Sequence, residues 1–273
     1  MAHTEIGHDQ EHFATETDSA RRFGGVARLY GASALDTFRR SHVTVVGIGG
    51  VGSWAVEALA RSAIGKLTLI DLDMIAESNV NRQAHALAGE FGRAKVSGMA
   101  QRIRLINPRC EVHEIEDFVT PENVAQLLCA SCDYVIDATD QVRTKAAMIA
   151  WAKPRGVPLI TAGSAGGQLD PTRIAITDLA RTIQDPLLAR VRSRLRRECG
   201  FPRDPRRKFG IPAVFSTEAV RPPLVEGACG ERPSAGGLSC AGFGSTVCVT
   251  ATFGFIAAGE VLQHLASRRS TVG

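Results

Sequence analysis

Short runs of β-branched residues alternate with segments of helical periodicity from Ser41 onward. Residues 42–48, HVTVVGI, form a β-branched run, and residues 51–65 place apolar side chains at helical spacing. Residues 66–73, KLTLIDLD, repeat the strand pattern and end in acids. We therefore predict a strand, helix, strand unit over this part of the chain.

The same alternation continues through the middle of the chain. Strands are predicted over residues 110–116, 134–140, 157–163 and 172–180. Helices are predicted over residues 92–106, 120–128, 142–156 and 186–199. Strands separated by helices favour a mainly parallel sheet that is covered on both faces. The predicted fold class is α/β, a Rossmann-like sheet flanked by helices, with a mobile basic excursion toward the C-terminus.

We expect one domain over residues 21–267, with a short tail over 268–273. Residues 1–20 are polar and acidic where a secretory leader needs a basic start and an apolar block, so a disordered tail is expected there. Residues 180–240 hold a basic helix candidate and then a stretch rich in Pro, Gly and Arg. They carry little apolar material, which predicts a basic flexible insertion and not a second domain.

The apolar segment over residues 241–262 is long enough to span a bilayer as a helix. Its recurrent Gly, Ser and Thr residues and Glu260 suit packing inside a protein better, so we predict a buried helix. The seven cysteines are scattered through 273 residues without a secretory leader. This indicates reduced thiols and a cytoplasmic protein, with peripheral membrane association left open.

A glycine-rich loop follows the first predicted strand. Gly47, Gly49 and Gly52 have the G-x-G-x-x-G spacing, with Gly50 between them, in the sequence VVGIGGVGSW. The first glycine permits a tight turn, the second lets the backbone approach a phosphate, and the N–H groups of the following helix face the anion. The loop therefore predicts a nucleotide site, for either a dinucleotide or ATP.

The residues that follow discriminate between these two nucleotides. Asp71 ends the second predicted strand, where a carboxylate accepts hydrogen bonds from ribose in NAD and in ATP alike. Asn79, Arg82 and Lys95 come next along the chain. A triphosphate under attack needs such cations and a carboxylate such as Asp140 for Mg²⁺, whereas a nicotinamide site does not. The charges favour ATP and Mg²⁺ as cofactors.

Five motifs, GIGGVG, LIDLD, SNVNRQ, GRAK and DATDQ, together resemble the adenylating fold shared by ubiquitin-activating enzymes and bacterial MoeB and ThiF. The resemblance implies a ThiF-type adenylating domain over residues 21–267. Its cofactor-binding residues would be Gly47, Gly49, Gly50, Gly52, Asp71, Asp73, Asn79, Arg82, Lys95 and Asp140. By the same resemblance Asp71 would hold ribose and Asp140 magnesium. The phosphates would be held by Asn79, Arg82 and Lys95. Arg82 and Lys95 would also act in catalysis, together with Asp140.

Further stretches, among them RFGGVARLYG, VFSTEAV and SCAGFGS, resemble the tRNA threonylcarbamoyladenosine dehydratase branch of this superfamily. This branch implies an ATP-dependent ligase-type enzyme that adenylates the threonyl carboxylate of a modified adenosine beside the anticodon. Ring closure then releases AMP, and water is lost overall. The expected partners are the modified tRNA, a second copy of the chain in a homodimer, and a cysteine desulfurase or sulfur-acceptor system.

Two features depart from the wider superfamily. MoeB and ThiF carry an early arginine that reaches the ATP of a neighbouring subunit, but Gly25 takes its place here and leaves Arg22 and Arg28 as substitutes. Those relatives also carry two C-x-x-C zinc pairs. This chain has a single such pair, Cys129 and Cys132, so a structural zinc ion is not expected.

Basic charge gathers between residues 190 and 208, which fits phosphate contacts with tRNA as well as a solvated helix face. The nucleic-acid candidates are Arg192, Arg196, Arg197 and Arg207. Cys240 precedes a helix candidate that could lower the pKa of its thiol. Direct ring closure needs no enzyme nucleophile, which argues against a catalytic role for Cys240 and leaves sulfur relay as its other candidate role.

Three other functions fit parts of the pattern. Adenylation of the C-terminal glycine of a ubiquitin-like sulfur carrier would use the same ATP site. An NAD-dependent oxidoreductase would use the same glycine loop. A catalytically inactive binding scaffold is disfavoured because the ATP-site residues are intact.

Overall fold

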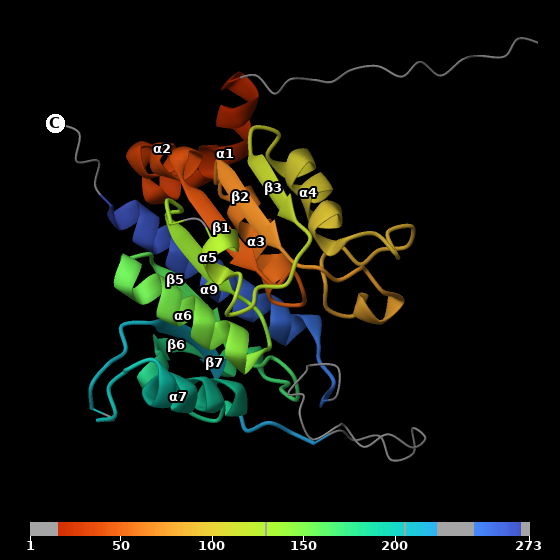
Figure 1. The fold of residues 1–273 in the computed structure, drawn as a ribbon. Coiled ribbons are helices and arrows are strands. Elements are labelled where there is room, and N and C mark those ends of the chain that lie inside the picture. The colour runs from red at the N-terminus through yellow and green to blue at the C-terminus, as the bar shows by residue number, and fades with distance from the viewer. Residues whose placement is uncertain (1–15, 129, 205, 223–242, 269–273) are drawn as a thin grey trace, which may run out of the picture.

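The computed structural model describes residues 16–128, 130–204, 206–222 and 243–268. In this part of the chain seven strands form one sheet in the order β3-β2-β1-β4-β5-β7-β6. The strands are β1 (His42–Val46), β2 (Lys66–Ile70), β3 (Glu111–Ile115), β4 (Tyr134–Asp137), β5 (Leu159–Ala162), β6 (Ile174–Asp178) and β7 (Pro212–Ser216). Every neighbouring pair is parallel except β6 with β7. The predicted mainly parallel α/β sheet is confirmed (Figure 1).

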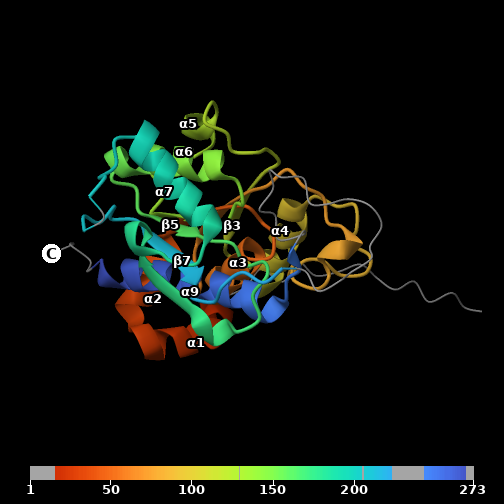
Figure 2. The same cartoon turned by 90° about the horizontal axis from the view of Figure 1, so that it is seen from below.

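Helices cover both faces of the sheet, as Figure 2 shows from below. One layer contains α1 (Glu16–Tyr30), α2 (Ala32–Arg40), α3 (Gly52–Arg61), α4 (Lys95–Ile106) and α9 (Val247–Ser267). The other contains α5 (Val124–Leu127), α6 (Val142–Arg155) and α7 (Pro186–Glu198). Short 3₁₀ turns complete the described elements: η1 (Glu77–Asn79), η2 (Pro171–Arg173) and η3 (Leu179–Arg181).

The two faces of the sheet build two separate cores. On β4, Tyr134 and Ile136 pack with the layer of α3 and α9, whereas Val135 between them packs with α6 and α7. Successive strand residues point to opposite faces, so a run of buried residues supplies both cores at once. This explains why the central strands β1, β4 and β5 are nearly continuous buried runs, whereas the edge strand β3 mixes polar with apolar residues.

Part of the region over residues 180–240 is packed into the domain, contrary to the predicted flexible insertion, although the helix predicted over residues 186–199 is confirmed as α7. There, α7 is a well-packed helix and β7 pairs with both β5 and β6. Ala213, Val214 and Phe215 are buried in the sheet, and this apolar run is enough to form a strand despite the surrounding Pro, Gly and Arg. Residues 223–240 lie outside the described chain, so the prediction of flexibility there stays a prediction.

The expected tail over residues 1–20 also needs correction, because α1 begins at Glu16. Within this helix Ser19 is buried, and its hydroxyl accepts a hydrogen bond from Arg39 at 3.2 Å. Contacts with α2 therefore hold the first turns of α1 against the domain. Residues 1–15 are not described.

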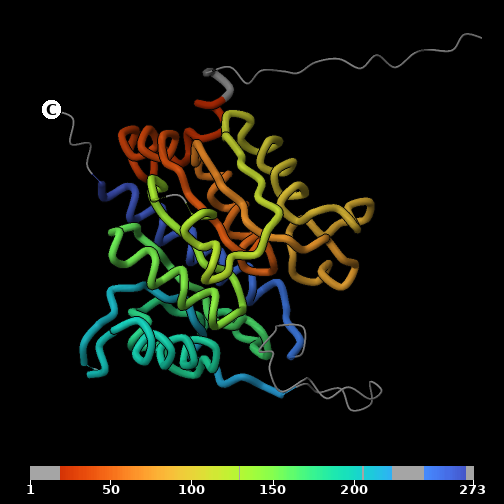
Figure 3. The backbone as a smooth tube through the Cα atoms, viewed as in Figure 1, coloured from red at the N-terminus to blue at the C-terminus, as the bar shows by residue number. Residues whose placement is uncertain are grey.

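The apolar C-terminal segment forms α9, which is long and apolar enough to cross a membrane but has half of its apolar stretch buried inside the protein. It packs mainly against α3 and α2 and passes behind the sheet in Figure 3. A Cβ on Gly254 would lie 2.5 Å from the carbonyl oxygen of Val51, so only glycine allows the two helices this close. The predicted helix is confirmed over Val247–Ser267, with one face buried against the domain and residues such as Phe255 exposed.

Candidate active site

A cavity opens at the carboxyl ends of the central strands. It is bounded by the glycine loop after β1, by Asp71 after β2 and by Asp140 after β4. The helices after β1 and β4 lie on opposite faces of the sheet, so the loops diverge between these neighbouring strands. Open α/β sheets bind ligands at such a switch point. The structure thus brings the predicted cofactor-binding residues to one place.

The geometry of the loop depends on its glycines. Gly47 has φ 86°, and a Cβ there would lie 2.9 Å from the Ala138 carbonyl group. A Cβ on Gly52, the first residue of α3, would lie 1.8 Å from the Gly47 oxygen. These two glycines therefore close the turn, while Gly49 and Gly50 line the cavity. The N-terminus of α3 directs free N–H groups to this side, where an anion is favoured.

Asp71 anchors the same loop from the neighbouring strand. One carboxylate oxygen accepts the N–H of Ile48 at 2.6 Å, and the other accepts the N–H of Asp73 at 2.9 Å. Burial raises the pKa of this carboxyl group, and the nearby Lys95 opposes that shift. His85 holds the other side of Ile48, with Nε2 at 2.9 Å from its carbonyl oxygen. Asp71 is therefore a structural anchor as well as a candidate for ribose binding.

Lys95 is buried, contrary to the expectation for an isolated helix lysine. Its ammonium group lies 2.6 Å from Asp73 and 4.0 Å from Asp71, and the residue is only 6% exposed. It opens α4 at the edge of the cavity. A cation balanced by two carboxylates can turn toward an arriving phosphate, because a charge-assisted bond replaces part of the existing pair.

Asn79 and Arg82 line the cavity from the η1 segment. The Asn79 side chain accepts the Ala76 N–H at 3.0 Å and so closes this turn. The Arg82 guanidinium donates to the Ser78 carbonyl oxygen and to Asn81 Oδ1, each at 2.9 Å. Asn79 thus shapes the segment, while Arg82 carries the positive charge.

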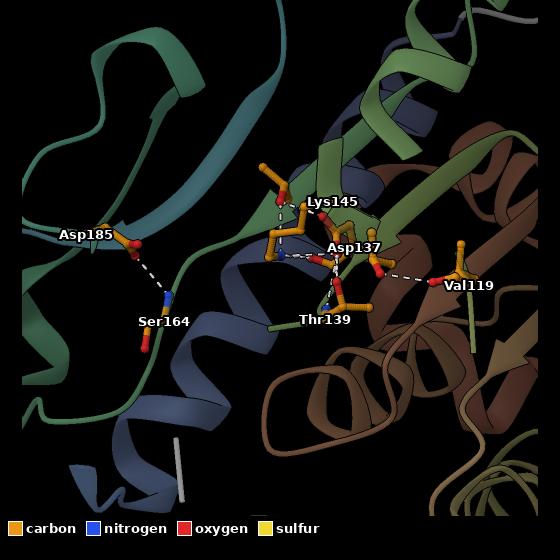
Figure 4. Close-up of polar contacts among 8 residues, drawn as sticks. Val119, Asp137, Thr139, Lys145, Ser164 and Asp185 are labelled. Atoms are coloured by element: carbon orange, nitrogen blue, oxygen red, sulfur yellow. Dashed lines mark hydrogen bonds and ion pairs between the residues drawn. The ribbon is translucent and has the colours of Figure 1, made fainter. Parts of the chain in front are cut away.

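Asp140 follows β4, is exposed and lines the cavity. Behind it, the buried carboxylate of Asp137 lies 3.1 Å from the Lys145 ammonium group and accepts the Thr161 hydroxyl at 2.7 Å. Asp137 also accepts the Thr139 N–H at 3.1 Å (Figure 4). Lys145 and Asp137 are fully buried, so this pair fixes the turn that presents Asp140.

Several cavity residues were missed by the sequence analysis. The β3 and β5 ends contribute two groups of lining residues, Asp117, Phe118 and Val119, and Gly163, Ser164 and Ala165. Their position at carboxyl ends of parallel strands was a usable signal. Gln83 and Thr250 also line the cavity. Thr250 gave no such signal, because only the packing of α9 on α3 brings it to the loop.

Asp185 links α7 to this cavity. Its carboxylate accepts the Leu188 N–H at 2.8 Å as the N-cap of α7 and the Ser164 N–H at 2.9 Å (Figure 4). A Cβ on Gly163 would lie 1.9 Å from the same carboxylate. Burial raises the Asp185 pKa, against the effect of these N–H donors.

The four nucleic-acid candidates lie away from the cavity lining, on α7 and the segment after it. Arg192 donates to the Thr182 hydroxyl, and Arg196 donates to the Pro202 carbonyl oxygen at 3.2 Å while covering the Phe209 ring. Arg197 is exposed and pairs with Glu198 at 2.7 Å, and Arg207 is exposed. Arg192, Arg196, Arg197 and Arg203 line a polar depression.

The candidates for the early arginine and for a thiol or metal site lie in different parts of the chain. Arg22 donates two hydrogen bonds of 3.0 Å to the last carbonyl groups of α4, at Leu105 and Ile106, and so has a structural role within its own chain. Arg28 is exposed on α1. Cys129 and Cys240 lie outside the described residues. Among the described residues, no group of three or more His, Cys, Asp or Glu side chains is placed so that it could hold a metal ion.

Comparisons with known proteins agree with this geometry. The ThiF family model matches residues 24–272. The tRNA threonylcarbamoyladenosine dehydratase of Escherichia coli K12 is 52% identical over 258 residues, covering 93% of this chain and 96% of that protein. The Bacillus subtilis enzyme of the same name is 42% identical and covers 69% of this chain and 72% of its own length.

Solved structures lead to the same group of proteins. The Escherichia coli dehydratase in complex with ATP superposes with a TM-score of 0.84 at 49% identity, covering 95% of this chain and 99% of that one. Its AMP complex superposes with a TM-score of 0.83 at 50% identity, covering 93% and 97%. The resemblance proposed from the five motifs is confirmed, and the chain belongs to the ThiF family.

Proposed function

We propose that the protein is an ATP-dependent enzyme that dehydrates threonylcarbamoyladenosine in tRNA to a cyclic form. One observation carries this proposal: the glycine loop, Lys95, Arg82 and Asp140 line a single cavity in a chain whose relatives of this name match over nearly their full length. The likeness to an ATP complex supports ATP over NAD. An inactive scaffold is disfavoured because the charged residues of the cavity are all present.

The chemistry follows from the substrate groups. The threonyl carboxylate attacks the α-phosphate of ATP, the bond to pyrophosphate breaks, and a mixed anhydride with AMP forms. A nucleophile within the same modified base then attacks the acyl carbon and displaces AMP. Holding this nucleophile close makes the second step effectively intramolecular. The oxygen that leaves with AMP came from the carboxylate, so the nucleoside loses one water overall.

The chain supplies mainly positioning and charge. The glycine loop and the N-terminus of α3 would receive phosphate oxygens, and Arg82 and Lys95 would offset charge as pyrophosphate leaves. Asp71 would hold the ribose. Asp140 fits magnesium, because a single exposed carboxylate beside a phosphate site is the environment that this ion uses. Bound there, the ion would neutralise phosphate charge.

The same proposal extends to the oligomeric state, the cellular location and the partners of the protein. We propose a cytoplasmic homodimer in which residues 21–267 form the adenylating domain and the arginines near α7 contact tRNA phosphates. A cysteine desulfurase system is a candidate partner, with Cys240 as a candidate sulfur acceptor. The match of the ThiF family model supports the extent of the adenylating domain, and the basic depression on α7 supports the contact with tRNA phosphates.

Pyrophosphate release tests the proposed function. The purified protein is incubated with ATP and Mg²⁺ and with modified tRNA, unmodified tRNA or none, and the nucleosides are then analysed by mass spectrometry. We expect release and loss of one water only with the modified tRNA. Activity that instead requires a ubiquitin-like carrier ending in glycine would replace this function with carrier adenylation. NAD binding without ATP binding would favour the oxidoreductase.

A further inference from the structure

Two polar side chains of the cavity take no part in the roles assigned above. Gln83 is 7% exposed and Thr250 is 1% exposed, and both line the cavity. Gln83 Oε1 and Thr250 Oγ1 are buried, and neither has a hydrogen-bond partner among the residues that the structure describes. Buried polar atoms of native proteins nearly always have a hydrogen-bond partner. Two neighbouring oxygens without a partner at the wall of a cavity therefore point to a ligand.

These two side chains flank the part of the glycine loop where the attacked phosphate would lie. Thr250 Cβ is 3.4 Å from the position that a Cβ would take on Gly50, and Gln83 Nε2 is 3.9 Å from the corresponding position on Gly49. Asn81 Nδ2 donates to the Ser245 carbonyl oxygen at 2.9 Å. This bond ties the segment that carries Gln83 to the start of the helix that carries Thr250.

Their chemistry differs from that of the phosphate-binding residues. An amide oxygen only accepts hydrogen bonds, and a hydroxyl group both donates and accepts. Phosphate oxygens of the nucleotide offer no N–H or O–H at neutral pH, so they cannot satisfy Gln83 Oε1. The unpaired Gln83 oxygen therefore requires a ligand with donor groups, placed next to the phosphate, and the Thr250 hydroxyl group can donate to or accept from the same ligand.

We propose that Gln83 and Thr250 bind the N–H and hydroxyl groups beside the substrate carboxylate. This inference rests on the proposed function, whose substrate is an N-carbamoyl amino acid on the tRNA. Such a group has ureido N–H donors and a threonyl hydroxyl close to the carboxylate that must reach the α-phosphate. The pair would hold the carboxylate in line for attack and would select acyl groups that carry these donors.

Four variants test this subsite in matched pairs. Gln83→Met and Thr250→Val remove the two unpaired groups with little change of shape. Gln168→Met and Thr44→Val make the same changes at buried side chains that also lack partners among the described residues but do not line the cavity. Thr250→Ser keeps the hydroxyl group. For each variant, kcat and KM for modified tRNA come from pyrophosphate release, the ATP Kd from titration, and Tm from thermal unfolding.

We expect kcat/KM for modified tRNA to fall roughly three- to tenfold in Gln83→Met and in Thr250→Val, the scale of one lost neutral hydrogen bond each. The ATP Kd should not change, and Thr250→Ser and both control variants should match the wild type. Cavity variants that behave like their controls would overturn the subsite while the proposed function stands. An equal loss of ATP affinity would assign the pair to the nucleotide instead. A wild type inactive on modified tRNA would overturn both proposals.

Discussion

Lys95 combines burial with two carboxylate neighbours, and the three charges depend on one another. The pair with Asp73 spans 2.6 Å, and Asp71 is 4.0 Å away. An ammonium group in this setting is held in place before a ligand arrives, so little side-chain entropy is lost on binding. Asp140 differs, because it is exposed and its turn is fixed from behind by Asp137 and Lys145.

Removing either charge should therefore affect turnover more than folding. Lys95→Ala and Asp140→Asn are each expected to lower AMP formation by on the order of a hundredfold or more, as when the transition state loses a charged partner. AMP release with modified tRNA is the measurement, and circular dichroism checks the fold. Lys66→Ala, which removes an ion pair with Glu111 on the sheet, serves as the control for loss of a lysine. Near-wild-type turnover in both cavity variants would contradict the ATP-site assignment.

His85 provides a pH-dependent contribution to stability. Burial lowers its pKa from 6.5 to about 4, so between these values the unfolded chain binds a proton that the folded chain does not. The contribution of His85 to the free energy of unfolding is thus fully present above pH 6.5 and is lost as the pH falls toward 4. The loss amounts to about 3 kcal/mol at most. The difference in unfolding free energy between wild type and His85→Gln, measured in denaturant, should fall over this range. A constant difference would show that His85 titrates alike in both states.

At the element scale, α7 serves two purposes. Its apolar face, with Leu188, Val191 and Leu195, is buried against α6, and its cap Asp185 binds the loop at Ser164. Its arginines differ in a similar way, because Arg192 and Arg196 bond to neighbouring segments while Arg197 is exposed and pairs with the adjacent Glu198. Reversing the charge of the first two would also remove folding contacts.

The exposed arginines give the cleaner test of tRNA binding. The double variant Arg197→Glu, Arg207→Glu should weaken binding of modified tRNA and flatten the dependence of its affinity on salt, because fewer counterions are released. ATP binding should stay the same. Filter binding across a range of salt concentrations measures the tRNA affinity and its salt dependence. The double variant Arg21→Glu, Arg40→Glu, at exposed positions of α1 and α2, is the matched change elsewhere on the surface. An unchanged salt slope would mean that this face does not contact tRNA.

The elements that the sequence predicted well are those whose apolar pattern is strong. The strands before and after the glycine loop are buried in both cores, so their composition alone revealed them. The strand β7 was missed because only Ala213, Val214 and Phe215 mark it within a stretch rich in Pro, Gly and Arg. In the cavity, charged residues could be found from motifs, but Thr250 could not, since its place depends on how α9 packs against α3.

At the scale of the whole molecule, distant segments converge on one cavity. The loop after β1, the segment around Arg82, the turn after β4 and α9 come from both ends of the described chain. Such a site can align a carboxylate, a phosphate and a second nucleophile without forming a covalent bond to substrate. Positioning of this kind can supply much of the rate enhancement that two-step acyl transfer needs.

Cys240→Ala separates direct ring closure from a covalent route. If the activated acyl group is attacked from within the substrate, the enzyme must supply orientation and leaving-group stabilisation but no thiol. The rate of ATP-dependent dehydration of the modified tRNA should then fall by no more than a few-fold in the variant. Removal of an obligatory nucleophile would cause a far larger loss. Mass spectrometry of the nucleoside is the measurement, with AMP counted in parallel, and Cys248→Ala on the exposed start of α9 is the control. AMP release without cyclic product would contradict direct closure, and a thioester trapped on Cys240 in the wild type would establish the covalent route.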